Sequence, residues 1–245
     1  MAGHSKWANI RFRKGKQDAA RNKVFTKLAR LITVAAKQGS DPLTNASLRL
    51  AMDKAQRMNM GKDIVQRAIS KGDKSQGAED LVAVRYEGYG PGGIACWVHG
   101  LTDNRNRTVA EVRHAFSKLG GSMGAEGTVS YLFQHRGLIL CSHEEEERLI
   151  ELVIESGALD VKPLENNMYE VLTEPNDFEK IKNNLQADNI RIEEAELTYL
   201  PDNEVACEKD QALKVMKLID MLEGLDDVQS VYTNAGFPEG FDPDE

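Results

Sequence analysis

The stretch that decides the fold is GLILCSHEEEERLIELVIESGALDVKPLENNMYEVLTEPNDFEKIKNNLQADNIRIEEAELTY, residues 137–199. Its apolar residues follow strand and helix spacing in turn. The pattern predicts strands over 137–141, 161–164, 168–172 and 192–199, and helices over 144–156 and 177–187. In the first helix, the apolar residues expected to face inward are Leu149, Ile150, Val153 and Ile154. The order βαββαβ is that of a ferredoxin-like domain.

A glycine-rich segment precedes this unit, between two β-rich runs over 81–86 and 94–101. Gly88, Gly90 and Gly93 satisfy the G-x-G-x-x-G expression. In a dinucleotide site that expression opens a helix, because the pyrophosphate binds at the helix N-terminus. Here a second strand follows instead. We therefore predict a hairpin loop and no nucleotide cofactor.

Residues 102–111 predict the start of a helix. Thr108 and Glu111 match the S/T-x-x-E capping box, which places the first helical residue at Val109. Arg105 and Arg107 would then stand just before a helix N-terminus, where backbone N–H groups favour an anion. The two arginines form a phosphate site, or they pair with local acids such as Asp103 or Glu87. The sequence supports both interpretations equally.

The segments before and after residues 137–199 are predicted to form one sheet together. The segment before it has the order ββαβ, with its last strand over 128–133, and so has one helix for its sheet. A helix over 210–222 and a strand over 228–232 can return to that sheet. We therefore predict an α+β protein of three domains, with the following limits: a helical domain over 1–79, an α+β domain over 80–133 and 204–237, an inserted ferredoxin-like domain over 134–203, and a disordered acidic tail over 238–245.

Charge divides the chain unevenly. Residues 1–80 hold 17 Lys and Arg against 7 Asp and Glu, a net charge of +10, whereas the remaining 165 residues carry −18. Such asymmetry is typical of a protein with one end that binds a polyanion. The alternative is a solvated basic face, although solubility faces usually mix both signs.

The basic end predicts an arm followed by three short amphipathic helices. Residues 1–15 form the arm, and helices follow from about Gln17 to Gln38, around Leu48–Ala55, and over 62–71. Trp7 either anchors the arm or stacks on a base. The residues that we predict to bind nucleic acid are Lys6, Trp7, Arg11, Arg13, Lys14, Lys16, Arg21, Lys23, Lys27, Arg105 and Arg107.

Other function classes find little support. The sequence has no run of 18–20 apolar residues and no signal-peptide core, so we expect a cytoplasmic protein without a membrane partner. Three cysteines at long spacings predict neither disulfides nor zinc. The run Glu144–Glu147 lies in the first turn of a helix, where acids favour the dipole, and its side chains diverge. With no nucleophile–base pair, we expect no enzyme, no metal, no cofactor and no small-molecule substrate.

Several long strings resemble the YebC family. They are MAGHSKWANI (1–10), YEGYGPGG (86–93), TDNRNRT (102–108) and AEVR (110–113). The resemblance covers nearly the whole chain in the same order. It implies a helical N-terminal domain and two α+β domains, the third inserted in the second, with no catalytic site. Members are described as transcriptional regulators that bind DNA, whereas mitochondrial and some bacterial relatives act as translation activators on the ribosome.

These observations predict a non-enzymatic nucleic-acid-binding regulator of gene expression. The first hypothesis is a DNA-binding transcriptional regulator. The alternative is a ribosome-associated translation factor that binds ribosomal RNA, since modular domains around a basic arm suit an irregular RNA surface.

Overall fold

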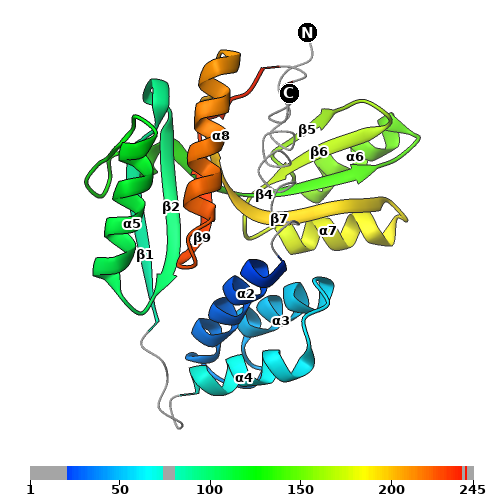
Figure 1. Cartoon of the computed structure of the whole chain (residues 1–245). Coiled ribbons are helices and arrows are strands. Elements are labelled where there is room, and N and C mark those ends of the chain that lie inside the picture. The colour runs from blue at the N-terminus through cyan, green and yellow to red at the C-terminus, as the bar shows by residue number, and fades with distance from the viewer. Residues whose placement is uncertain (1–20, 74–80, 239–240, 242–245) are drawn as a thin grey trace. The chain divides into compact units, whose positions relative to one another are not determined.

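The computed structural model describes residues 21–73, 81–238 and 241 (Figure 1). The described residues divide into two compact units. One holds residues 21–73, 81–130 and 210–232, and the other holds residues 131–209, 233–238 and 241. Each unit is therefore built from segments that lie far apart in the sequence.

The first unit begins with a bundle of three helices, α2 (Arg21–Ala36), α3 (Ala46–Arg57) and α4 (Lys62–Gly72). Their apolar stripes meet in a core that includes Leu28, Ile32, Leu48, Ala55 and Ile69. Gly72 allows α4 to approach α2 closely, because a Cβ atom at this position would lie 2.2 Å from the Thr33 carbonyl oxygen. Side-chain and backbone packing thus fix the helices against one another.

The same unit contains a four-stranded sheet in the order β3-β1-β2-β9. Its strands are β1 (Val82–Tyr89), β2 (Ala95–Thr102), β3 (Ser122–Met123) and β9 (Val228–Thr233). Helices α5 (Arg105–Lys118) and α8 (Lys209–Glu223) pack on it. The return of β9 beside β2 completes the sheet, as the sequence predicted.

The β1–β2 hairpin and the edge strand of this sheet can be compared with the predictions. β1 and β2 pair antiparallel, with Tyr89 opposite Ala95, and a short 3-10 turn (Pro91–Gly93) joins them. The hairpin predicted for the glycine-rich loop is therefore confirmed. The strand predicted over 128–133 is wrong for residues 128–132. The edge strand is β3, because the Glu87 carboxylate accepts hydrogen bonds from the backbone N–H groups of Gly127, Val129 and Ser130 and holds that segment as a loop.

The second unit contains the βαββαβ element order. Its elements are β4 (Phe133–Ser142), α6 (Glu146–Ser156), β5 (Asp160–Pro163), β6 (Met168–Thr173), α7 (Phe178–Ala187) and β7 (Arg191–Pro201). The strands form an antiparallel sheet in the order β5-β6-β4-β7. Leu149, Val153, Ile181 and Leu185 of the two helices join the core of this sheet. The predicted α+β fold with a ferredoxin-like unit is confirmed.

Three smaller elements complete the description: the 3-10 turn η4 (Ser130–Leu132) and the parallel pair β8 (Val205–Ala206) with β10 (Ala235–Gly236). Beyond β10, Phe241 is buried and stacks on Phe237. The prediction of a disordered tail is therefore wrong for Phe241, and residues 239–240 and 242–245 lie outside the described residues.

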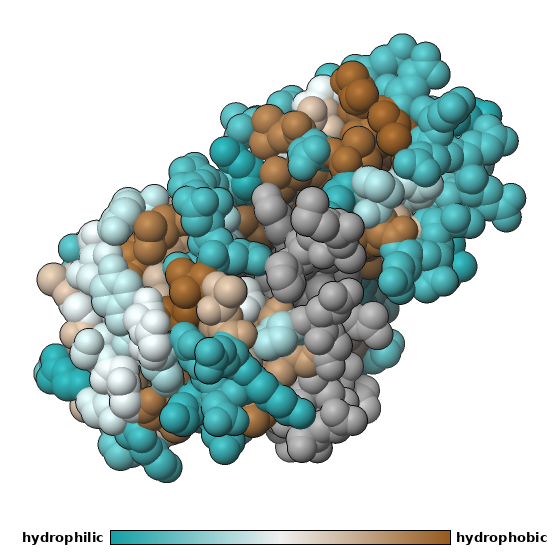
Figure 2. Space-filling view, turned by 90° about the horizontal axis from the view of Figure 1, so that it is seen from above, coloured by the Kyte–Doolittle hydropathy of each residue, from teal (hydrophilic) through white to brown (hydrophobic). Residues whose placement is uncertain are grey.

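Some apolar side chains reach the surface. Ile154 is 63% exposed, so the prediction that it faces inward is wrong. The buried positions of α6 are Leu149, Val153 and Ser156, and Ile154 lies one residue, or about 100°, beyond that stripe. On the face drawn in Figure 2, hydrophobic residues form separate patches among hydrophilic ones. Scattered apolar patches of this kind are normal for a folded protein.

Candidate nucleic-acid interface

The predicted nucleic-acid-binding residues fall into three groups. Lys6, Trp7, Arg11, Arg13, Lys14 and Lys16 lie outside the described residues, and Arg21 begins α2. Lys23 and Lys27 lie on α2, and Arg105 and Arg107 lie on α5. The structure therefore gives side-chain contacts for Lys23, Lys27 and Arg107, and the exposure of Arg105.

The lysines of α2 contact the end of α8. Lys23 Nζ donates to the Gly224 carbonyl oxygen at 2.9 Å, and Lys27 Nζ donates to the Glu223 carbonyl oxygen at 2.9 Å. The last carbonyls of a helix lack partners within the helix and carry the negative end of its dipole. The two ammonium groups therefore cap α8 from a helix some 200 residues away in the sequence.

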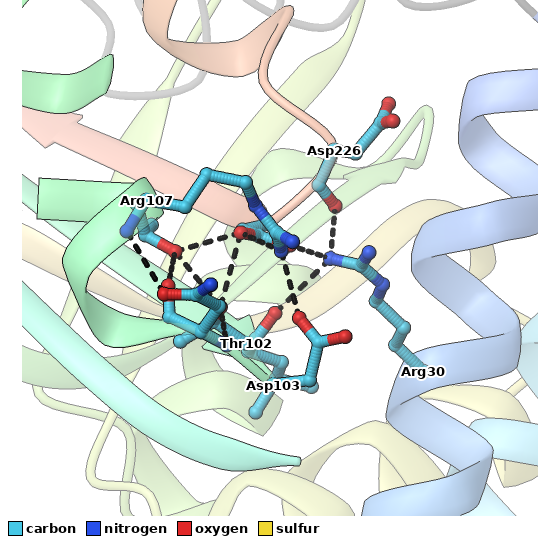
Figure 3. Close-up of polar contacts among 9 residues, drawn as sticks. Arg30, Thr102, Asp103, Arg107 and Asp226 are labelled. Atoms are coloured by element: carbon cyan, nitrogen blue, oxygen red, sulfur yellow. Dashed lines mark hydrogen bonds and ion pairs between the residues drawn. The ribbon is translucent and has the colours of Figure 1, made fainter. Parts of the chain in front are cut away.

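Arg30 lies about one helical turn beyond Lys27 on α2, and Figure 3 shows its contacts. Its guanidinium donates to the backbone carbonyls of Leu101 and Asp226, at 3.2 and 2.9 Å, and forms an ion pair with the Asp227 carboxylate. Lys23, Lys27 and Arg30 have the spacing of one helix face. We call residues 223–227 the α8–β9 turn, and this face of α2 is bonded to it.

Asp227 is the centre of the contact. Its side chain is 2% exposed, and Arg107 lies 2.7 Å away as a second ion-pair partner. Its carboxylate also accepts from the Thr108 and Thr102 hydroxyls at 2.7 and 3.0 Å. Burial alone would raise the pKa of Asp227, but the hydrogen bonds from these residues and from Arg30 outweigh it and lower the pKa to about 2.

The start of α5 differs from the prediction. The helix begins at Arg105, and its N-cap is Asn104, whose side-chain oxygen accepts from the Arg107 N–H at 3.1 Å. The capping box at Thr108 is therefore wrong. The Thr108 hydroxyl is buried against Asp227 instead, so it is not available to cap a helix.

This shift places both arginines inside the first turn of α5, where the helix dipole disfavours a cation. Arg107 is compensated by Asp103 at 2.8 Å and by Asp227, and these bonds raise its pKa above the ordinary value. Arg107 thus makes the local pairing that was the alternative to a phosphate site. Arg105 is exposed. Glu87 is not their partner, since backbone N–H groups hold its carboxylate.

A cavity of about 290 Å³ lies beside the lysines of α2. Its apolar wall comes from Val24, Leu28 and Leu31, and the side chains of Lys23, Lys27 and Lys54 also line it. Burial lowers the pKa of Lys27; the nearby Glu223 opposes this, and Lys23 and Lys54 add to it. Three ammonium groups therefore share this region with two acidic residues, Asp220 and Glu223.

Sequence reasoning missed two parts of this region. Asp227 carries no local signal, because its partners come from residues 30, 102, 107 and 108. Lys54, Arg57 and Lys62 form the other part, on α3 and α4. Their signal was present, since polar flanks beside an apolar stripe mark the exposed face of a helix.

Within residues 21–73, 81–238 and 241, no helix has the length and apolar character needed to cross a bilayer. In the same ranges, no three His, Cys, Asp or Glu side chains gather in a way that could hold a metal ion.

Comparison with known proteins covers nearly the whole chain. Residues 5–75 match the family model described as the TACO1/YebC protein N-terminal domain, and residues 81–235 match that of the TACO1/YebC second and third domain. A protein of Coxiella burnetii (strain Dugway 5J108-111) named "Probable transcriptional regulatory protein" is 53% identical over 241 residues, covering 98% of this chain and 99% of its own. A relative of the same name from Pseudomonas fluorescens Pf-5 is 50% identical, over 98% and 97% of the two chains.

A solved structure agrees with the fold. The crystal structure of a conserved hypothetical protein from Aquifex aeolicus matches with a TM-score of 0.77 and 44% sequence identity. The match covers 90% of this chain and 92% of that one. The architecture described above is therefore shared with that protein.

Proposed function

Since the chain belongs to the TACO1/YebC family, we propose that it is a non-enzymatic transcriptional regulator that binds duplex DNA. Relatives that match it over nearly their full length carry the name "Probable transcriptional regulatory protein", which supports this role. Binding proceeds through contacts to backbone phosphates, which position a protein on DNA.

The observation that carries the proposal is the separation of charge. The first 80 residues carry +10 and the rest −18, so a polyanion is attracted to one end and repelled by the other. Attraction to phosphates releases condensed counterions, and the resulting affinity falls steeply with salt. The acidic part then limits how much of the protein touches the duplex.

The proposed contacts centre on the basic arm: Lys6, Trp7, Arg11, Arg13, Lys14 and Lys16. Arg21 and the exposed Arg105 add to them. Lys23, Lys27 and Arg107 take part only where phosphate oxygens replace the carbonyl and carboxylate oxygens that they contact within the chain.

Fluorescence anisotropy with a panel of labelled duplexes tests the function. We expect Kd to rise steeply with salt, and at least one duplex selected from genomic fragments to bind more tightly than the others at physiological salt. Equal binding to all duplexes at that salt would contradict regulation at specific sites. Absence of binding even at low salt would contradict nucleic-acid binding altogether.

A charge-reversal variant tests the arm. Replacing Arg11, Arg13, Lys14 and Lys16 by Glu should abolish binding while circular dichroism stays unchanged. The matched control replaces four exposed lysines outside the basic end, Lys118, Lys209, Lys214 and Lys217, by Glu. It changes the net charge equally, so loss of binding in both variants alike would assign the effect to total charge and not to the arm.

A second experiment separates DNA from the ribosome. Crosslinked lysate is sedimented through a sucrose gradient with and without ribonuclease, and the protein is detected in each fraction. A protein that stays at the top of the gradient supports the DNA role. Migration with ribosomal subunits that ribonuclease abolishes would replace the transcriptional role by a translational one.

A further inference from the structure

Three cations of the helical bundle have no hydrogen bond or ion pair within the described part of the chain. Lys54 and Arg57 lie in the last turn of α3, and Lys62 is the first residue of α4. All three are exposed. We call these three residues the α3–α4 edge. We propose that the α3–α4 edge binds the phosphate backbone of nucleic acid, a site that rests on the proposed function and adds to the arm.

Several other cations of the bundle are already bonded to oxygen atoms of the chain. Lys23, Lys27 and Arg30 donate to the α8–β9 turn, and Lys37 donates to the Leu81 carbonyl oxygen at 3.0 Å. A phosphate that contacted these groups would first have to displace those oxygens. The α3–α4 edge requires no such exchange, because within the described ranges its head groups have neither a hydrogen bond nor an ion pair.

Two acids lie beside the α3–α4 edge in the sequence, Asp53 and Asp63. Asp63 follows Lys62 directly, but its carboxylate is bonded to the Arg67 guanidinium at 2.7 Å. Asp53 is the acid of α3, and it is exposed beside Lys54. On α3 and α4, three cations therefore face solvent beside one carboxylate, that of Asp53, which no arginine holds.

The surface around Lys54 is hollowed. Lys54 borders the 290 Å³ cavity together with Lys23 and Lys27, and the three lysines outnumber the two acids of its lining, Asp220 and Glu223. Leu50 lies one turn before Lys54 and is 58% exposed. An apolar side chain among cations suits a partner that offers phosphates together with the apolar faces of sugars and bases.

The test measures binding of a labelled duplex by a triple variant, Lys54→Glu, Arg57→Glu and Lys62→Glu. The matched control is Lys118→Glu, Lys214→Glu and Lys217→Glu, which removes the same charge from exposed helical positions elsewhere. We expect the edge variant to bind at least about tenfold more weakly at 0.15 M salt, with a shallower dependence of log K on log salt by about 2 to 3. We expect the control to stay within about threefold of the natural protein.

The outcomes separate this proposal from the function it rests on. If the natural protein binds duplex and the edge variant matches the control in affinity and slope, the edge proposal is overturned and the function stands. If the natural protein binds no duplex at any salt concentration, the proposed function and the edge proposal are both contradicted. Competition by polyglutamate as strong as that by duplex at equal charge would assign the edge to an acidic protein, which also overturns it. If circular dichroism shows that the Glu variant is unfolded, the same comparison is made with Gln at the three positions.

Discussion

Two sets of cations on the same small bundle have opposite environments. On α2, Lys23, Lys27 and Arg30 are bonded to carbonyls and to a buried carboxylate of the α8–β9 turn. On α3 and α4, the α3–α4 edge faces solvent without a bonded acceptor in the described part of the chain. Residue type is the same in both sets, and the tertiary partners differ.

A basic helix in the sequence therefore does not by itself identify a nucleic-acid contact. The face of α2 holds segments together that are about 200 residues apart, and its charges offset the negative end of α8. The α3–α4 edge contributes little to stability but is available to a ligand. Stability and binding should therefore respond to different substitutions.

The largest effect on the free energy of unfolding is expected at Asp227, the buried carboxylate that Arg30 of α2 contacts. Asp227→Ala removes a buried carboxylate that serves Arg30, Arg107 and two threonine hydroxyls. Loss of one partner of a buried ion pair typically costs 3–5 kcal/mol, and we expect about 3 kcal/mol here because Arg107 can be hydrated. Urea denaturation measures it.

Asp226 provides the control for that substitution. Its side chain is exposed, and Arg30 bonds only to its backbone carbonyl. Asp226→Ala should therefore change the free energy of unfolding by less than about 0.5 kcal/mol. Equal destabilisation by the two substitutions would show that the carboxylate of Asp227 is not the centre of the contact.

A smaller effect on the free energy of unfolding is expected when the pH is lowered. The pKa of Asp227 is about 2, below its value of 3.8 in the unfolded chain, so this group stabilises the fold above pH 3.8 and loses that contribution as pH falls toward 2. The difference in unfolding free energy between the natural protein and Asp227→Asn should thus be largest near neutrality and shrink by about 2 kcal/mol by pH 2. A difference that is constant with pH would mean that the carboxyl has no depressed pKa.

The parts of the fold that the sequence predicted are those with local signals. The ferredoxin-like unit was found because each element has its own apolar period and the order of elements is diagnostic. The start of α5 was not predicted correctly, because Asn104 and Thr108 both have side chains that cap helices. Only the buried position of Thr108 beside Asp227 decides between them.

The interface was harder to predict than the fold. Lys23 and Lys27 carry the same sequence signal whether they contact a phosphate or a helix C-terminus, since both present oxygen atoms with negative charge. The partner of each lysine lies about 200 positions away, beyond any window of local pattern. Ile154 shows the same limit on a smaller scale. It follows the buried Val153 by one residue, and the corresponding rotation about the helix axis, about 100°, turns its side chain from the core to solvent.

The smallest effect compares two lysines on the wall of one cavity. Lys27→Met keeps the apolar stem but leaves the Glu223 carbonyl without its donor, which should lower the free energy of unfolding by about 1 kcal/mol. Lys54→Met removes an exposed cation and should change it by less than about 0.5 kcal/mol. Duplex affinity should show the reverse order, with the larger loss at Lys54. Both quantities can be measured on the same two variants by urea denaturation and anisotropy. The same rank order in stability and affinity would mean that the two sets of cations do not differ in role, because each lysine would then act through the fold.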